Sequence, residues 1–310
     1  MRKQSRFALL IGVAVVLTMI ISACGSTSGS GSTPTPSTGG GTSTGQLNCV
    51  SGSITAGGST ALQPLVDAVA KKYQGKCSGA NITVQGGGSK VGLGQVEAGA
   101  FQIGNSDVFA ASSQSDLVDN QVAVVVFTLV VNPDVTGVTN LTGAQILSIY
   151  TGQVSNWSQV GGPNLPIVVV SRPTTSGTRA TFKQYVLNGT AESPKQATNL
   201  TADSTTLVLQ TVEQTKGAIG YVTLGAATQE GSKVVILNID GNAPTPTQVE
   251  SNTYKFWNIE HMYTKGAASG LSKALIDYMT SDDAKSAATS LQFLLIASMS
   301  QSAIAAHQPK

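Results

Sequence analysis

The sequence has few charged residues and almost no net charge. Only 11% of its 310 residues are Asp, Glu, Lys or Arg, and the formal net charge is +2. Globular proteins carry charges at about a quarter of their positions, so this chain relies mainly on neutral polar groups. Binding to a nucleic-acid backbone requires a basic patch or run. No such run occurs beyond the first six residues, so we expect no nucleic-acid partner.

Metal-ligating residue types are also scarce. The two histidines, His261 and His307, are far apart in the sequence, and neither stands beside a pair of cysteines. Zinc sites use clusters of His and Cys at short spacings. We therefore expect no metal site and no cofactor.

The first of the three cysteines, Cys24, closes a leader with the features of an export signal. Arg2, Lys3 and Arg6 form a basic start, and residues 7–23 contain no charge. A basic start, an apolar stretch and a small-residue end are typical of a signal peptide. The apolar stretch is near the lower length limit for crossing a bilayer, so an uncut signal anchor is the alternative.

The end of this leader, Ile21-Ser22-Ala23-Cys24, resembles the lipobox of bacterial lipoproteins. The resemblance implies a signal peptide over residues 1–24 and lipidation of Cys24 as the new N-terminus. The protein would then be anchored to the cell membrane on its extracytoplasmic face. Residues 25–46 are almost wholly Gly, Ser, Thr and Pro, a composition that predicts a flexible tether.

The other two cysteines, Cys49 and Cys77, follow the tether. An exported chain meets an oxidising environment, and an even count favours pairing. We predict a disulfide between them, which for a loop of about 28 residues would stabilise the fold by roughly 3–4 kcal/mol. Two buried free thiols are the alternative.

Strand-like and helix-like patterns alternate through the remaining residues. Ile82–Gln85 and Ile167–Val170 are predicted as short strands, and the apolar run Val122–Val131 as a strand buried on both faces. Helical spacing of apolar residues occurs over 62–73 and 271–279. This alternation predicts an α/β fold with mostly parallel sheets flanked by helices, in which ligands bind where strands end and helices begin.

Three glycine-rich turns that carry hydroxyl groups each precede a predicted helix. They are Gly58-Ser59-Thr60, Gly88-Ser89 and Ser176-Gly177-Thr178. A helix N-terminus presents free N–H groups and a partial positive charge. A single turn of this kind is usually only a helix cap, but three that converge would surround a small oxyanion with donors.

Two charged residues narrow the choice of oxyanion. Arg172 stands four residues before Ser176, and its planar guanidinium suits a tetrahedral oxyanion. Asp107 would repel an anion unless the ligand carries a proton that the carboxylate can accept. Phosphate keeps such a proton near neutral pH and sulfate does not, so Asp107 favours phosphate. A surface ion pair or a helix cap is the alternative role for each residue.

The phrases AGGSTALQP, VQGGGS, IGNSD and SGTRATF resemble those of the phosphate-binding proteins that serve bacterial ABC importers. The resemblance covers about residues 52–265. It implies a two-lobed type II periplasmic-binding-protein fold, with lobe one at 47–125 and 258–310 and lobe two at 126–257. It also implies a monomer without enzymatic activity, which holds phosphate in the interlobe cleft and delivers it to the transmembrane subunits of a permease.

Matching positions in the family imply the binding residues. They are Thr60, Ala61, Ser89, Asp107, Arg172, Ser176, Gly177 and Thr178, with Ser59 and Ser106 as further candidates. Two positions depart from the family pattern. Thr174 stands where many relatives have an acid that pairs with the arginine, so we expect Arg172 to be less neutralised. Lys90 replaces a small residue and is expected either to point to solvent or to add charge at the rim.

Three rival functions remain at this stage. A serine hydrolase would use Ser59 or Ser176 as its nucleophile, but neither histidine stands in a recognisable triad motif. The same fold could bind another oxyanion, such as sulfate, molybdate or a phosphonate. A surface lipoprotein that has lost its binding function is the third.

Overall fold

The computed structural model describes residues 47–309. The predicted signal peptide, the lipidation site Cys24 and the tether at 25–46 lie outside the described residues. Within 47–309, no helix is both long enough and apolar enough to span a bilayer.

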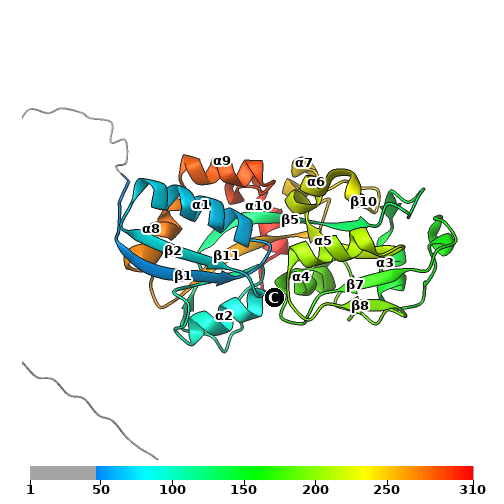
Figure 1. The fold of residues 1–310 in the computed structure, drawn as a ribbon, viewed down its shortest axis with the longest axis horizontal. Helices are drawn as coiled ribbons and strands as arrows, with labels where there is room; N and C mark the ends of the chain where they lie inside the picture. Colours follow the sequence, from blue (N-terminus) through cyan, green and yellow to red (C-terminus); the bar gives the residue numbers. More distant parts are fainter. Residues whose placement is uncertain (1–46, 310) are drawn as a thin grey trace, which may run out of the picture. The chain divides into compact units, whose positions relative to one another are not determined.

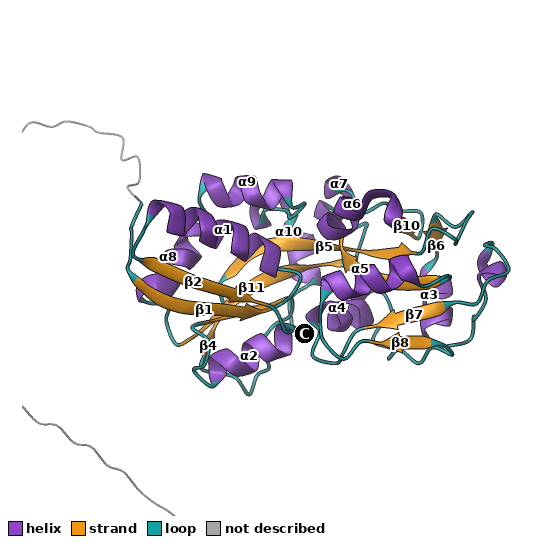
Figure 2. Ribbon diagram, viewed as in Figure 1, coloured by secondary structure: helices purple, strands orange, loops and turns teal. Residues whose placement is uncertain are grey.

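The elements form two groups that two long strands connect (Figures 1 and 2). The first group contains β1 (Gly52–Gly58), α1 (Gln63–Lys76), β2 (Ala80–Gln85), α2 (Ser89–Glu97), β3 (Ile103–Ser106), β4 (Leu117–Val118), α8 (Gly270–Tyr278) and α9 (Asp282–Ser290). The second group contains β6 (Asn140–Leu141), α3 (Gly143–Tyr150), η1 (Trp157–Val160), β7 (Val168–Ser171), α4 (Gly177–Tyr185), β8 (Ala197–Asn199), α5 (Thr205–Gln214), β9 (Ala218–Thr223), α6 (Leu224–Glu230), η2 (Gly231–Lys233), β10 (Val235–Ile239) and α7 (Pro246–Glu250). The connecting strands are β5 (Gln121–Val131) and β11 (Trp257–Lys265), and the chain ends with η3 (Ile296–Ser298) and α10 (Gln301–Ala306).

The strands hydrogen bond in the order β2-β1-β3-β11-β5-β9-β7-β8. The outer pairs are parallel, as the alternation of strands and helices predicts. The centre differs, because β5 and β11 are antiparallel to each other and to their outer neighbours β9 and β3. The reason is that the chain crosses between the groups once in each direction. The apolar run of β5 is buried on both faces, as predicted, although its neighbours are antiparallel.

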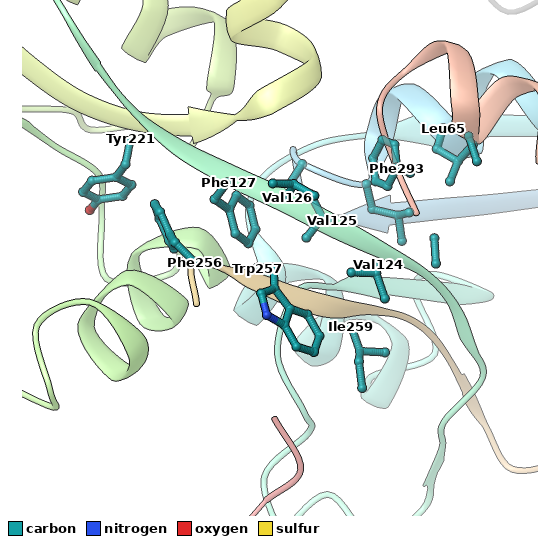
Figure 3. Packing of buried hydrophobic residues seen from close by; sticks show 14 of the residues in the cluster. Leu65, Val124, Val125, Val126, Phe127, Tyr221, Phe256, Trp257, Ile259 and Phe293 are labelled. Atoms are coloured by element: carbon teal, nitrogen blue, oxygen red, sulfur yellow. The ribbon is translucent and has the colours of Figure 1, made fainter. Parts of the chain in front are cut away.

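The aromatic core lies around these crossing strands (Figure 3). Phe127 of β5 packs on Phe256, with ring centroids 5.2 Å apart, and Phe256 packs on Phe182 of α4 at the same distance. Phe182 stacks on Tyr221 of β9 at 4.4 Å. One hydrophobic cluster contains these residues and also Leu65 of α1, so the core is continuous from one group to the other.

Two local features bear on the sequence predictions. A disulfide joins Cys49 to Cys77, with Cα atoms 5.2 Å apart, and connects the segment before β1 to the end of α1. The turn before α1 is held by Ser59. The helix begins at Gln63, and the Ser59 hydroxyl accepts the N–H groups of Ala61 and Leu62 within the preceding turn.

Candidate anion-binding site

The glycine-rich turns of the two groups meet in space. Gly177, at the start of α4, lies so close to the start of α2 that an added Cβ would be 2.1 Å from the Ser89 hydroxyl and 3.0 Å from the Asp107 Cβ. Only glycine permits this approach. The backbone N–H of Lys90 also donates to the Thr175 carbonyl across 3.1 Å. The helices α2 and α4 belong to different groups, and their N-termini therefore lie at the same place.

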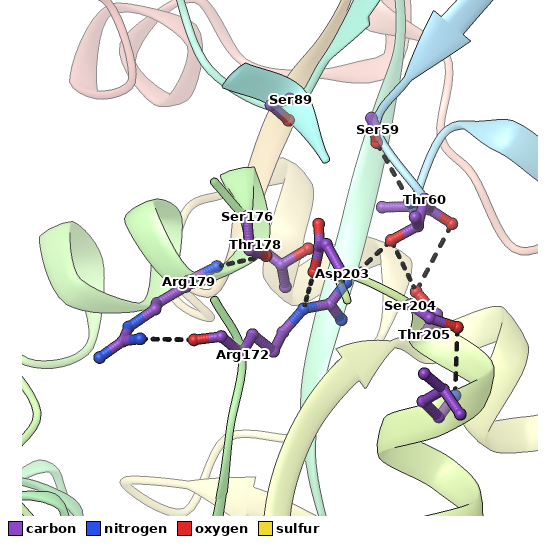
Figure 4. Close-up of polar contacts among 12 residues, drawn as sticks. Ser59, Thr60, Ser89, Arg172, Ser176, Thr178, Arg179, Asp203, Ser204 and Thr205 are labelled. Carbon is purple, nitrogen blue, oxygen red and sulfur yellow. Dashed lines mark hydrogen bonds and ion pairs between the residues drawn. The ribbon is translucent and has the colours of Figure 1, made fainter. Parts of the chain in front are cut away.

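Arg172 lies at the centre of this place, directly after β7 (Figure 4). Its side chain is buried, and its Nε and Nη2 atoms each lie 2.8 Å from Oδ1 of Asp203. Nη2 also donates to the Thr60 hydroxyl at 2.8 Å, which links the second group to the first. The guanidinium is thus held rigidly by a carboxylate on one side and a hydroxyl on the other.

The expectation that Arg172 is less neutralised is wrong. Thr174 is exposed and plays no part in the ion pair, whereas Asp203 supplies the missing negative charge from the loop before α5. Sequence reasoning missed Asp203 because it is 31 residues from Arg172. The sequence carries a weak signal for Asp203, because this acid directly precedes Ser204, the residue that caps α5.

Asp107 occupies the opposite side of the site, directly after β3. Its Oδ2 atom accepts the Thr178 hydroxyl at 2.9 Å, and its backbone N–H donates to the Ser89 hydroxyl at 2.9 Å. Its backbone carbonyl accepts from the Asn258 amide at 2.6 Å. Burial raises the pKa of Asp107, while the hydroxyls of Ser59 and Thr178 and the charge of Arg172 act in the opposite direction.

Two buried atoms of opposite character have no hydrogen-bond partner among the described residues. They are Nη1 of Arg172, a donor, and Oδ1 of Asp107, an acceptor. Buried polar atoms are nearly always hydrogen bonded, so such a pair points to a ligand. The N–H groups of Gly177 and Thr178 also lack intrahelical acceptors, because they begin α4. The Ser176 hydroxyl caps only the next N–H, that of Arg179.

The other predicted residues are placed as follows. The Ala61 N–H donates to Ser59 within its own turn, 3.1 Å away. The Ser106 hydroxyl is bonded to the backbone of Val108, so it serves a local turn. Lys90 is exposed to solvent, which was one of its two expected positions. A cavity of about 580 Å³ is lined by Val108, Asn258, residues of α4 and the C-terminal segment.

Neither histidine serves a serine nucleophile in residues 47–309. His261 lies 2.8 Å from Asp119, and His307 is stacked between Tyr185 and Trp257. The Ser176 hydroxyl is engaged as a helix cap. A nucleophile and a base within hydrogen-bond reach are required for serine hydrolysis, and this part of the chain does not assemble them. The same residues contain no cluster of three metal-ligating side chains.

Comparisons with known proteins agree with this architecture. The family model for a PBP superfamily domain matches residues 36–283. The phosphate-binding protein PstS of Bacillus subtilis is 41% identical over 285 residues, which cover 91% of this chain and 90% of that protein.

Solved structures are also similar. A substrate-binding protein assigned to phosphate ABC transport in Clostridium perfringens, solved with bound phosphate, has a TM-score of 0.72 and 25% identity, covering 79% of this chain and 100% of its own. An ABC-type phosphate transport receptor from Vibrio cholerae has a TM-score of 0.64 and 26% identity, covering 78% of this chain and 99% of its own.

Two groups of elements joined by two crossing strands, with a buried polar site between them, define a two-lobed substrate-binding protein of the type II periplasmic kind. The first group is lobe one and the second is lobe two. The chain belongs to the PBP superfamily and, within it, to the family of the phosphate-binding protein PstS.

Proposed function

We propose that this protein binds inorganic phosphate between its lobes. The observation that carries the proposal is the pair of buried, unpartnered atoms, Nη1 of Arg172 and Oδ1 of Asp107. A protonated oxyanion accepts a hydrogen bond from the first and donates one to the second. Sulfate has no proton to donate, so its oxygen would face a buried acceptor, which costs about 1–3 kcal/mol or more.

Each proposed phosphate ligand keeps a group with which it can bind. Ser89 and Ser176 accept hydrogen bonds within the protein, and each retains its own O–H as a rotatable donor. The Thr60 hydroxyl accepts from Arg172 and shares a longer hydrogen bond, of 3.4 Å, with the Thr205 hydroxyl, which it can exchange for the ligand. Gly177 and Thr178 offer N–H groups at the positive end of α4. The Ala61 N–H already has a partner in Ser59 and requires a small turn adjustment to reach the ligand.

The ligand would tie the lobes together, because Asp107 belongs to lobe one and Arg172 to lobe two. Residues 47–125 and 258–310 would move as one lobe and 126–257 as the other, about β5 and β11. The closed, loaded form would be recognised by the transmembrane subunits of an ABC phosphate permease. Lipidation of Cys24 would keep the protein, as a monomer without enzymatic activity, at the extracytoplasmic face of the membrane.

Calorimetric titration of the purified protein with phosphate and with sulfate at neutral pH tests this function. We expect phosphate to bind and sulfate to bind at least about tenfold more weakly, in line with one unpaired buried acceptor. Equal binding of both anions would refute proton recognition and favour a general oxyanion-binding protein. No binding of either anion would refute the function.

A further inference from the structure

Glu260 is a fully buried acid beside the proposed site that the binding scheme does not use. It lies on β11, where His261 pairs with Ser106 in the antiparallel register with β3. Extending this register by one residue places Glu260 opposite Asp107. Asn258, two residues earlier on the same strand, donates to the Asp107 carbonyl, which confirms that β11 lies against this loop.

The carboxyl groups of Glu260 and Asp107 cannot both be ionised at low cost. Neither Glu260 oxygen has a donor among the described residues, and Oδ1 of Asp107 also has none. Two ionised carboxylates are both acceptors, so they repel each other without any hydrogen bond. When two carboxylates share a buried site, one of them takes up a proton. That proton creates the donor that the pair lacks.

The surroundings decide which carboxyl holds the proton. Asp107 receives the Thr178 hydroxyl and the positive charge of Arg172, both of which favour its ionised form. Glu260 has no such support. Its burial and the charge of Asp107 raise the pKa of Glu260 well above its usual range. The proton therefore belongs on Glu260.

Other charged groups do not change this assignment. Asp203 acts on Asp107 from lobe two, where it is paired with Arg172. On β11 itself the next ionisable residue is His261, whose ring is bonded to Asp119. On the neighbouring strand β5, the residue opposite Glu260 is Ala123.

We propose that Glu260 is a positioning residue of the phosphate site, which stays protonated and donates its O–H to Asp107. An ionised carboxylate has about four lone-pair sites, so Asp107 can still accept the proton of phosphate. This inference rests on the proposed function. The donated hydrogen bond keeps Asp107 an ionised acceptor, which is the state that reads the proton of phosphate. When Glu260 ionises at high pH, the site gains a second negative charge beside the ligand, and phosphate is repelled.

Two substitutions separate these effects. Glu260→Gln keeps an N–H donor toward Asp107 and cannot ionise. We expect phosphate affinity within about threefold of wild type at neutral pH, since the hydrogen bond is retained. We also expect the loss of affinity at high pH to disappear. Glu260→Ala removes the donor, so Asp107 protonates at a higher pH, and the preference for phosphate over sulfate falls at every pH below the raised pKa of Asp107.

The experiment is calorimetric titration of wild type, both variants and Glu213→Gln with phosphate and with sulfate, from pH 5 to pH 10. Glu213 is exposed and far along α5, so its variant controls for the loss of one acid. The inference is overturned if Glu260→Gln follows the wild-type profile at high pH, or if Glu260→Ala keeps the wild-type preference. Failure of wild type to bind phosphate would refute the proposed function instead.

Infrared spectroscopy covers the case in which Glu260→Ala does not fold. A buried protonated carboxylic acid has a C=O stretching band distinct from that of a carboxylate. We expect wild type at neutral pH to show such a band and Glu260→Gln to lack it. An identical spectrum for the two proteins in this region would contradict a protonated Glu260.

Discussion

The two charged pairs at the site are built in opposite ways. On lobe two, Arg172 and Asp203 carry opposite charges and neutralise each other before any ligand is bound. On lobe one, Asp107 lies opposite Glu260, a second buried acid, which we propose stays protonated. Neither pair gives the site a net positive charge. This arrangement indicates that the site holds an anion by oriented N–H and O–H groups and by helix N-termini rather than by net charge.

The largest effect is expected for Arg172→Ala, which destroys the lobe-two pair. It removes a proposed ligand and leaves Asp203 buried without its partner, so binding should weaken by about 3–5 kcal/mol and stability should also fall. Calorimetry with phosphate and a denaturant titration measure the two effects. Thr174→Ala, an exposed neighbour, is the matched control. Unchanged affinity in Arg172→Ala would remove Arg172 from the site.

Asp203→Asn tests whether neutralisation of Arg172 stabilises the ligand-free protein. It leaves a buried guanidinium without its counter-charge, so we expect a loss of about 3 kcal/mol of stability without ligand. Phosphate would replace the missing negative charge and should therefore stabilise this variant more than it stabilises wild type. Thermal denaturation with and without phosphate measures the difference. Equal stabilisation of both proteins would show that Asp203 only shapes the loop.

Asp107→Asn changes the lobe-one pair with the smallest change of shape. The amide can donate to an oxyanion, so sulfate is no longer rejected by an unpaired acceptor. We expect phosphate to lose about 1–3 kcal/mol and the preference over sulfate to decrease. Competition between the two anions for the variant provides the measurement. A preference as strong as that of wild type would assign proton recognition to another group.

The last prediction concerns His307, a buried titratable group outside both pairs, which should affect stability and leave phosphate binding unchanged. It is stacked at 3.9 Å from Tyr185 and 3.6 Å from Trp257, and burial lowers its pKa from 6.5 to about 3. The unfolded chain therefore binds a proton in this range and the folded protein does not. Stability should be complete above about pH 6.5 and should decrease as the pH falls toward 3.

His307→Phe should remove this part of the pH dependence. Denaturant unfolding of wild type and variant between pH 4 and pH 8 measures it. The comparison separates the pH dependence of folding stability from the pH dependence of phosphate binding, which we assign to Asp107 and Glu260. Identical slopes in the two proteins would show that folding does not lower the pKa of His307.

Features that depend on neighbouring residues could be predicted from the sequence. The capping box of Thr142 and Gln145 at the start of α3 is such a feature, because its hydrogen bonds join residues three positions apart. The strands β5 and β9 are recognisable by their apolar runs, since burial on both faces demands such residues.

Features that depend on residues distant in sequence could be seen only in the tertiary structure. The antiparallel centre of the sheet follows from two crossings between the lobes, which no local pattern records. Asp203 meets Arg172 because the loop before α5 packs against the end of β7, and the register of β11 on β3 places Glu260 opposite Asp107. Local hydrogen bonds and periodicity are encoded over a few residues. The partner of a buried charge is set by which segments pack together, and that is a property of the whole fold.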